Sequence, residues 1–195
     1  MNINVILFSD FETLDVFGPV EVFGKVENYT IEYYSQQGGS ITNKDGLKIE
    51  TQKIDNIKIN DVLFIPGGSG TRIEVNNTEF LSNIRVLAEK SRYVLTVCTG
   101  SALLARTGLL DGKKATSNKR AFDWVKSNSD QVNWIQQARW IIDGKYYTSS
   151  GVSAGIDMAL GFISDLQGKD IAEAIAFRIE YNWQSDKEHD DFWKQ

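Results

Sequence analysis

The chain has 195 residues, of which 42% are hydrophobic and only two are prolines. This composition excludes a disordered or low-complexity chain, and the length favours one packed globular domain. The formal net charge of −5 argues against a nucleic-acid partner, because binding to a phosphate backbone requires a basic surface.

The N-terminal stretch, MNINVILFSDFETLD, has no basic segment and turns acidic after a short apolar run, so it does not resemble a signal peptide. No apolar run approaches the roughly 20 residues that span a bilayer. We therefore expect a cytoplasmic protein with no membrane partner. The single cysteine, Cys98, cannot form an internal disulfide, which agrees with a reducing compartment.

Apolar runs of strand length alternate along the chain with segments of helix length. The strand candidates are residues 3–8, 30–35, 61–68 and 93–98. The helix candidates are residues 19–27, which begin with Pro19, and residues 78–91, 100–108, 119–128, 153–168 and 170–183. Residues 137–151 predict a β-hairpin around the turn Asp143-Gly144. We expect a single domain of residues 1–184, followed by a polar C-terminal tail of residues 185–195.

This alternation predicts an α/β fold with a mostly parallel sheet and helices on both faces. Ligands of such sheets bind at the carboxyl ends of the strands. Three places satisfy that rule: the loop after the first strand, the PGGSG segment at residues 66–70, and the turn that contains Cys98.

Cys98 lies where a strand ends and a helix begins, and Gly100 permits a tight turn. The pattern is typical of a nucleophile elbow, which presents a side chain beside converging backbone N–H groups. A helix N-terminus favours the thiolate, so the pattern predicts a low thiol pKa. The alternative is a small, buried hydrophobic side chain at a strand end.

A nucleophile needs a group that handles protons. The only histidine, His189, lies in the acidic tail, so a Cys-His protease or amidotransferase triad is not expected. One cysteine and one histidine also supply too few ligands for a metal site. Asp15 remains, either as a group at a helix start or as an acid that shares one proton with Cys98.

Two further segments admit two interpretations each. The amides of Gly67, Gly68 and Gly70 could form an oxyanion hole with the amide of Thr99, or they could belong to an ordinary turn. The basic segment KKATSNKR, residues 113–120, is either a solvated rim or an anion site.

Four segments carry a family resemblance: LDVFGPVEVF (14–23), DVLFIPGGSG (61–70), VCTGSALLARTGLLDGKKAT (97–116) and SSGVSAGIDMAL (149–160). Through them the chain resembles the ThiJ/PfpI superfamily, and within it the isonitrile hydratase-like branch. The resemblance implies a flavodoxin-like three-layer sandwich, a homodimer, and no cofactor or metal. It also implies that Cys98 is the nucleophile, Asp15 its acidic partner, and Thr99 the residue after the nucleophile. Asn118 stands where relatives often have histidine.

The resemblance implies a hydro-lyase that adds water to a small isonitrile and forms an N-substituted formamide. Cys98 would attack the isonitrile carbon to give a covalent thioimidate, with Asp15 supplying and accepting protons. Two alternatives remain: glyoxalase or deglycase chemistry on α-oxoaldehydes, and a redox sensor or stress protein without turnover.

Overall fold

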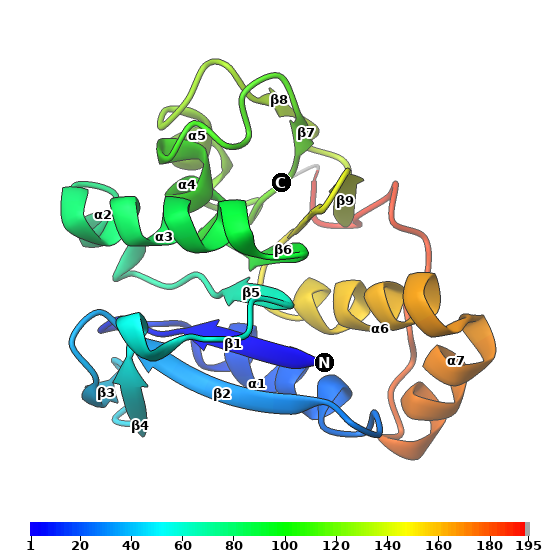
Figure 1. Cartoon of the computed structure of the whole chain (residues 1–195). Coiled ribbons are helices and arrows are strands. Elements are labelled where there is room, and N and C mark those ends of the chain that lie inside the picture. The colour runs from blue at the N-terminus through cyan, green and yellow to red at the C-terminus, as the bar shows by residue number, and fades with distance from the viewer. Residues whose placement is uncertain (194–195) are drawn as a thin grey trace.

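A sheet of eight strands forms the centre of the computed structural model, which describes residues 1–193 (Figure 1). The strand order is β3-β4-β2-β1-β5-β6-β10-β9. The strands are β1 (Asn2–Ile6), β2 (Thr30–Ser35), β3 (Gly39–Thr42), β4 (Lys48–Lys53), β5 (Val62–Ile65), β6 (Tyr93–Val97), β9 (Trp140–Asp143) and β10 (Tyr146–Ser149). A separate two-stranded sheet pairs β7 (Lys114–Ala115) with β8 (Asn133–Trp134).

Strands β4, β2, β1, β5, β6 and β10 pair in parallel, whereas β3 and β9 are antiparallel to their neighbours at the two edges. Val5 illustrates the register, because it lies opposite Tyr33 on one side and Phe64 on the other. Val5 and Phe64 are both completely buried, as strands covered on both faces require. The mostly parallel sheet is therefore confirmed.

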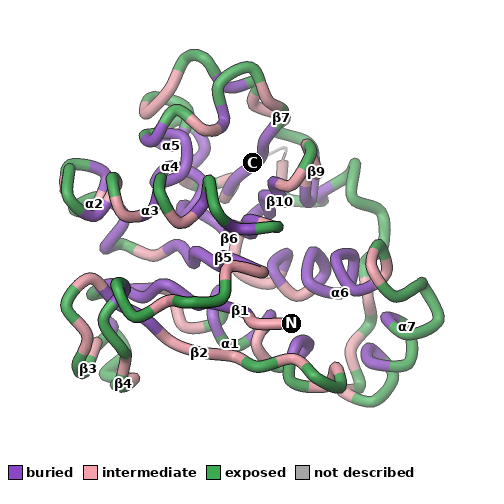
Figure 2. Tube along the Cα trace, in the orientation of Figure 1, coloured by how far each residue is buried: buried purple, intermediate pink, exposed green. Residues whose placement is uncertain are grey.

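Helices cover both faces of the sheet. They are α1 (Thr13–Phe23), α2 (Thr71–Glu74), α3 (Thr78–Lys90), α4 (Gly100–Arg106), α5 (Phe122–Lys126), α6 (Ala154–Gln167) and α7 (Lys169–Arg178), with a 3-10 turn at Ile54–Asn56. Figure 1 shows α2 to α5 grouped on one side and α1, α6 and α7 on the other, and α1 packs on α6. The buried residues follow the central strands and the inner sides of these helices (Figure 2). The three-layer α/β fold is thus confirmed.

The first helix begins earlier than the sequence predicts. The helix α1 begins at Thr13, so Pro19 lies inside it, and Asp15 lies in its first turn and not in a loop. Proline removes one helical hydrogen bond, but Val16, Val22 and other side chains of this helix are buried in the core. Tertiary packing of this kind contributes most of the stability of a helix in a protein and outweighs the local cost.

The predicted hairpin is present as β9 and β10, with Asp143 opposite Tyr146 across the turn. The last helix is shorter than predicted, because α7 ends at Arg178. Strands β3 and β4 had no counterpart among the predicted elements, since they are mostly exposed and lack an apolar run.

The segment predicted to be a polar tail packs against the domain in its described part, up to residue 193. Arg139 N donates to Lys187 O at 2.9 Å, and Asp190 N donates to Gln137 O at 2.8 Å. The Asp190 side chain is buried beside Arg139, with 3.7 Å between Oδ2 and the nearest guanidinium nitrogen. The composition of a segment does not reveal such a partner from elsewhere in the chain.

None of the helices within residues 1–193 is both long and apolar enough to cross a bilayer.

Candidate active site

Cys98 follows β6 directly and lies two residues before α4, with φ at 56°. Residues other than glycine rarely adopt this left-handed conformation, and it persists where neighbours hold the backbone. The Cys98 N–H donates to Ser150 O at 3.0 Å. The Cys98 carbonyl accepts from Ser117 Oγ at 2.7 Å and from Ser101 Oγ at 3.1 Å. Both backbone polar groups of the cysteine are therefore fixed.

Asp15 is completely buried in the first turn of α1. Its Oδ2 accepts from Gly67 N at 2.9 Å, and within residues 1–193 its Oδ1 has no hydrogen bond of ordinary geometry. Burial and, to a smaller extent, the charge of Glu12 raise the pKa of this carboxyl, while the N–H groups of Gly67 and Val152 and the Cys98 thiol oppose the rise. The net result is a pKa of about 8. Near neutral pH the carboxyl group therefore holds a proton.

The structure brings the Cys98 thiol and Asp15 together, and the low thiol pKa expected from the sequence is wrong. Burial raises the pKa of the Cys98 thiol well above its ordinary value, and the neighbouring Asp15 charge adds to this rise. The N–H groups of Thr99 and Val152 and the Thr99 hydroxyl oppose it. Burial outweighs the influence of the short helix α4, because water no longer stabilises the thiolate. The two groups therefore form a buried pair that retains protons.

The glycine loop between β5 and α2 supports Asp15 and Thr99. Gly67 N donates to Asp15, Gly68 N donates to Thr99 Oγ1 at 3.0 Å, and Gly70 N donates to a backbone carbonyl in the loop after β1. Because all three amides already have protein acceptors, the predicted oxyanion hole from these glycines is wrong. Their role in this structure is to hold the catalytic candidates in place.

Gly67 lies so close to its neighbours that no side chain fits. A Cβ atom there would lie 2.6 Å from Thr99 N, 2.7 Å from Thr99 Oγ1 and 2.8 Å from Asp15 Oδ2. Thr99 Oγ1 also accepts from Thr71 Oγ1 at 3.0 Å. The Thr99 hydroxyl therefore joins the two loops, while its backbone N–H faces the Cys98 sulfur.

Val152 is a member of the site that the sequence analysis missed. It lies in the turn between β10 and α6 with φ at 41°, which is a genuine outlier for a β-branched residue. Its N–H lowers the pKa of both Cys98 and Asp15 and so faces the pair. The sequence did contain a signal for this loop. The small residues of SSGVSAG follow the last strand of the predicted hairpin and so mark a fourth loop at the carboxyl end of a strand.

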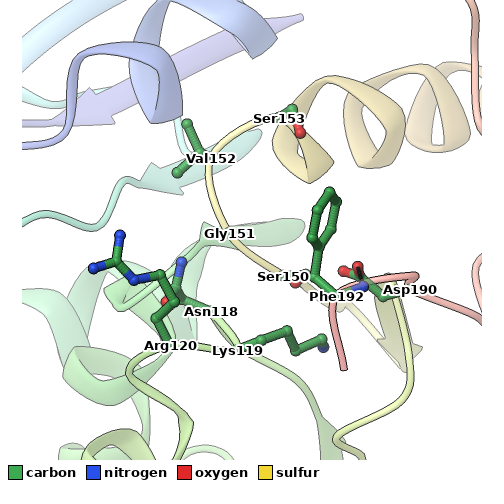
Figure 3. Close-up of a pocket in the computed structure, with 9 residues that line it drawn as sticks. All are labelled: Asn118, Lys119, Arg120, Ser150, Gly151, Val152, Ser153, Asp190 and Phe192. Atoms are coloured by element: carbon green, nitrogen blue, oxygen red, sulfur yellow. Dashed lines mark hydrogen bonds between the residues drawn. The ribbon is translucent and has the colours of Figure 1, made fainter. Parts of the chain in front are cut away.

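A cavity of about 470 Å³ adjoins this turn. Its lining residues, drawn in Figure 3, are Asn118, Lys119, Arg120, Ser150, Gly151, Val152, Ser153, Asp190 and Phe192. Cys98 itself does not line the cavity, but it contacts the wall through Ser150 O and the Val152 N–H. Asn118 lies beside Gly151, and its Oδ1 accepts from Ala121 N at 3.0 Å. A volume of this size is typical of small-molecule sites.

His189 is exposed and does not line the cavity. Its Nε2 lies 3.3 Å from Asp191 Oδ1 in the C-terminal segment. Within residues 1–193, no three histidine, cysteine, aspartate or glutamate side chains gather in a way that could hold a metal ion.

A second buried carboxylate, that of Asp157, lies in the first turn of α6. Asp157 Oδ2 accepts from Arg139 Nε at 2.7 Å, and Asp157 Oδ1 accepts from Gln184 N at 2.9 Å. Trp183 Nε1 donates to the Asp157 carbonyl at 3.2 Å. This ion pair connects the start of α6 with β9 and with the chain after α7.

Comparison with known proteins places these residues in a family context. Residues 1–165 match the DJ-1/PfpI family. An isonitrile hydratase of Pseudomonas putida is 31% identical over 183 residues, which are 93% of this chain and 78% of that protein. A deglycase of Thermococcus kodakarensis is 28% identical, with 76% of this chain and 89% of that protein aligned.

The HTH-type transcriptional regulator CdhR of Pseudomonas aeruginosa is 25% identical over 88% of this chain, which spans about half (52%) of the regulator. Among solved structures, a ThiJ/PfpI family protein from Pseudomonas syringae superposes with a TM-score of 0.81 and 28% identity. That superposition covers 93% of this chain and 75% of the other. The relatives thus share the fold, while their printed names include two enzymes and a regulator.

Proposed function

Since the chain belongs to the DJ-1/PfpI family, we propose that it is an enzyme that hydrates isonitriles to N-substituted formamides, with Cys98 as the nucleophile and Asp15 as the proton donor and acceptor. The observation that carries this proposal is the buried pair of thiol and carboxyl group, in which the carboxyl retains a proton and forms no ion pair with any described residue. The 31% identity to an isonitrile hydratase supports this choice of substrate. The strand–turn–helix position of Cys98 supports its role as a nucleophile.

The first step adds the elements of S–H to the terminal carbon of R–NC. The sulfur of Cys98 forms a bond to that carbon, and the carbon gains a proton from the Asp15 carboxyl group. Asp15 recovers a proton from the thiol, so the charge of the pair is unchanged. The product is a thioimidate, R–N=CH–S–Cys98.

The second step adds water to the thioimidate carbon. One oxygen of the Asp15 carboxyl accepts a proton from water as the C–O bond forms, and the other oxygen delivers a proton to the substrate nitrogen. The C–S bond then breaks, the oxygen forms the carbonyl of R–NH–CHO, and the sulfur recovers its proton. The N–H groups of Thr99 and Val152 lower the thiol pKa and so stabilise the leaving sulfur.

The test is formamide formation from an aryl isonitrile, measured by liquid chromatography with purified protein. We expect turnover by the wild type and none by Cys98→Ala. Asp111→Asn, which removes an exposed carboxylate, serves as the control and retains full activity. Turnover by Cys98→Ala at the wild-type rate would contradict the proposal.

The deglycase relative favours one other activity, the conversion of α-oxoaldehydes or their adducts. Consumption of methylglyoxal that requires Cys98, without any isonitrile turnover, would move the assignment to that activity. Absence of both activities, together with selective oxidation of Cys98 by mild peroxide, would favour redox sensing.

A further inference from the structure

The cavity beside Val152 contains one positive charge that no group of the described residues neutralises. Of the three charged residues that line it, Lys119 donates from Nζ to Ala138 O at 2.6 Å and to two further oxygens. Asp190 lies beside Arg139 and accepts from Phe192 N. Arg120 has neither a hydrogen bond nor an ion pair with any residue of the described chain, residues 1–193.

A second unused donor lies beside this guanidinium. Because Asn118 Oδ1 accepts from Ala121 N, its Nδ2 is directed to the other side, against Gly151. Within residues 1–193, no protein acceptor binds Nδ2. In Figure 3 the Asn118 amide nitrogen extends toward Gly151, and the Arg120 guanidinium lies on the other side of Asn118. This part of the cavity lining thus offers several N–H donors and a net positive charge.

The only carboxylate in the lining does not cancel this charge. Asp190 is 1% exposed and interacts electrostatically with both Arg139 and Lys119. Its negative charge is therefore balanced within the protein, on the side where the C-terminal segment packs. Arg120, which is exposed at the cavity, keeps its charge available for a ligand.

We propose that this cavity binds substrates that carry a carboxylate, with Arg120 as the ionic partner and Asn118 Nδ2 as a second donor, while the reactive carbon reaches Cys98. The planar guanidinium fits the two oxygens of a carboxylate. For the reactive group, this inference rests on the proposed function. The two proposals together specify isonitriles with a carboxylate substituent as the substrate class. The basic segment that includes Lys119 and Arg120 is then partly an anion site and not only a solvated rim.

The first test compares 4-isocyanobenzoate with its methyl ester, which differ in charge and share the reactive group. We expect kcat/KM of the wild type to be about tenfold higher for the acid, the usual gain from a hydrogen bond to a charged group. Arg120→Gln removes this preference through a higher KM for the acid. Arg178→Gln, which removes an exposed arginine away from the cavity, retains the preference. An ester hydrated as fast as the acid by the wild type would overturn the inference and leave the proposed function intact.

The second test does not depend on turnover. Because Cys98 is the only cysteine, alkylation by iodoacetate and by iodoacetamide reports on one thiol, and mass spectrometry gives both rates. We expect the ratio of the iodoacetate rate to the iodoacetamide rate to fall several-fold in Arg120→Gln and to stay constant in Arg178→Gln. An equal ratio in wild type and Arg120→Gln would overturn the inference. A ratio that depends on Arg120 in a protein that hydrates no isonitrile would support the anion site and refute the proposed function.

Discussion

Asp15 and Asp157 are both completely buried, and each lies in the first turn of a helix, yet their surroundings differ. Asp157 accepts from the guanidinium of Arg139 and from a backbone N–H. Asp15 accepts from the Gly67 N–H, has the Val152 N–H and the Cys98 thiol beside it, and forms no ion pair with any residue in 1–193. The same residue type at the same depth therefore faces two different electrostatic environments.

The difference between the two sites teaches how a buried carboxyl group acquires its role. Burial raises the pKa of both groups because a charge loses its hydration in the interior. At Asp157 the charge of Arg139 opposes this rise, so the site can hold an ion pair. At Asp15 nothing comparable opposes it, and the group keeps its proton. The first arrangement serves to fix the chain, and the second is suited to proton transfer.

The largest effect is expected from Asp15→Asn on activity. The amide retains the shape of the side chain but cannot relay a proton, so formamide production should fall about 10³-fold, within the range for lost acid–base catalysis. The measurement is kcat for an aryl isonitrile, with the near-UV circular dichroism spectrum as a check that the fold is intact. A folded variant with more than a tenth of wild-type activity would remove Asp15 from the mechanism.

Asp157→Asn should act on stability instead. Removing one partner leaves Arg139 buried without its main counter-charge, which costs about 3 kcal/mol of unfolding free energy, or roughly 6–12 °C in Tm. Urea unfolding followed by tryptophan fluorescence gives this number. Glu173→Gln, which breaks the exposed pair with Lys169, is the matched control and should cost less than about 0.5 kcal/mol. Equal losses of unfolding free energy in the two variants would show that the buried ion pair contributes no more to stability than the exposed one.

The pH dependence of stability distinguishes the two carboxyl groups further. The pKa of Asp15 rises from 3.8 to about 8 on folding, so the native state binds more protons between these values. Its contribution to stability is therefore fully present below pH 4 and is lost as the pH rises toward 8. Relative to the wild type, Asp15→Asn should gain about 7–15 °C in Tm at pH 8 compared with pH 5. Scanning calorimetry at both values tests this, and a constant difference would show that Asp15 does not titrate in this range.

The smallest effect is expected in the pH profile of the wild-type enzyme. Since the proposed first step needs a protonated Asp15, kcat/KM should decline above about pH 8, tenfold per pH unit at most. Initial rates with a neutral isonitrile, measured between pH 6 and 10, test whether kcat/KM falls or rises with pH. A rate that rises across this range would indicate instead that a thiolate formed at high pH is the active species.

The pattern of residues along the chain predicted much of this architecture. The alternation of apolar strands and amphipathic helices predicted the parallel sheet, because burial on both faces demands continuous apolar runs. Asp143-Gly144 predicted the hairpin, and the position of Cys98 between strand and helix placed it at the carboxyl end of β6. These features depend on neighbours that are close in sequence, which a periodic pattern can reveal.

Tertiary structure alone decided the chemistry of the site. The direction of the thiol pKa depends on burial and on Asp15, a residue 83 positions away from Cys98 along the chain. The amides of Gly67 and Gly68 proved to be occupied by side chains of other elements, and the Val152 N–H took a place beside the thiol. Hydration, hydrogen bonding and charge act over a few ångströms in space, so residues far apart in the chain determine them once the fold brings those residues together.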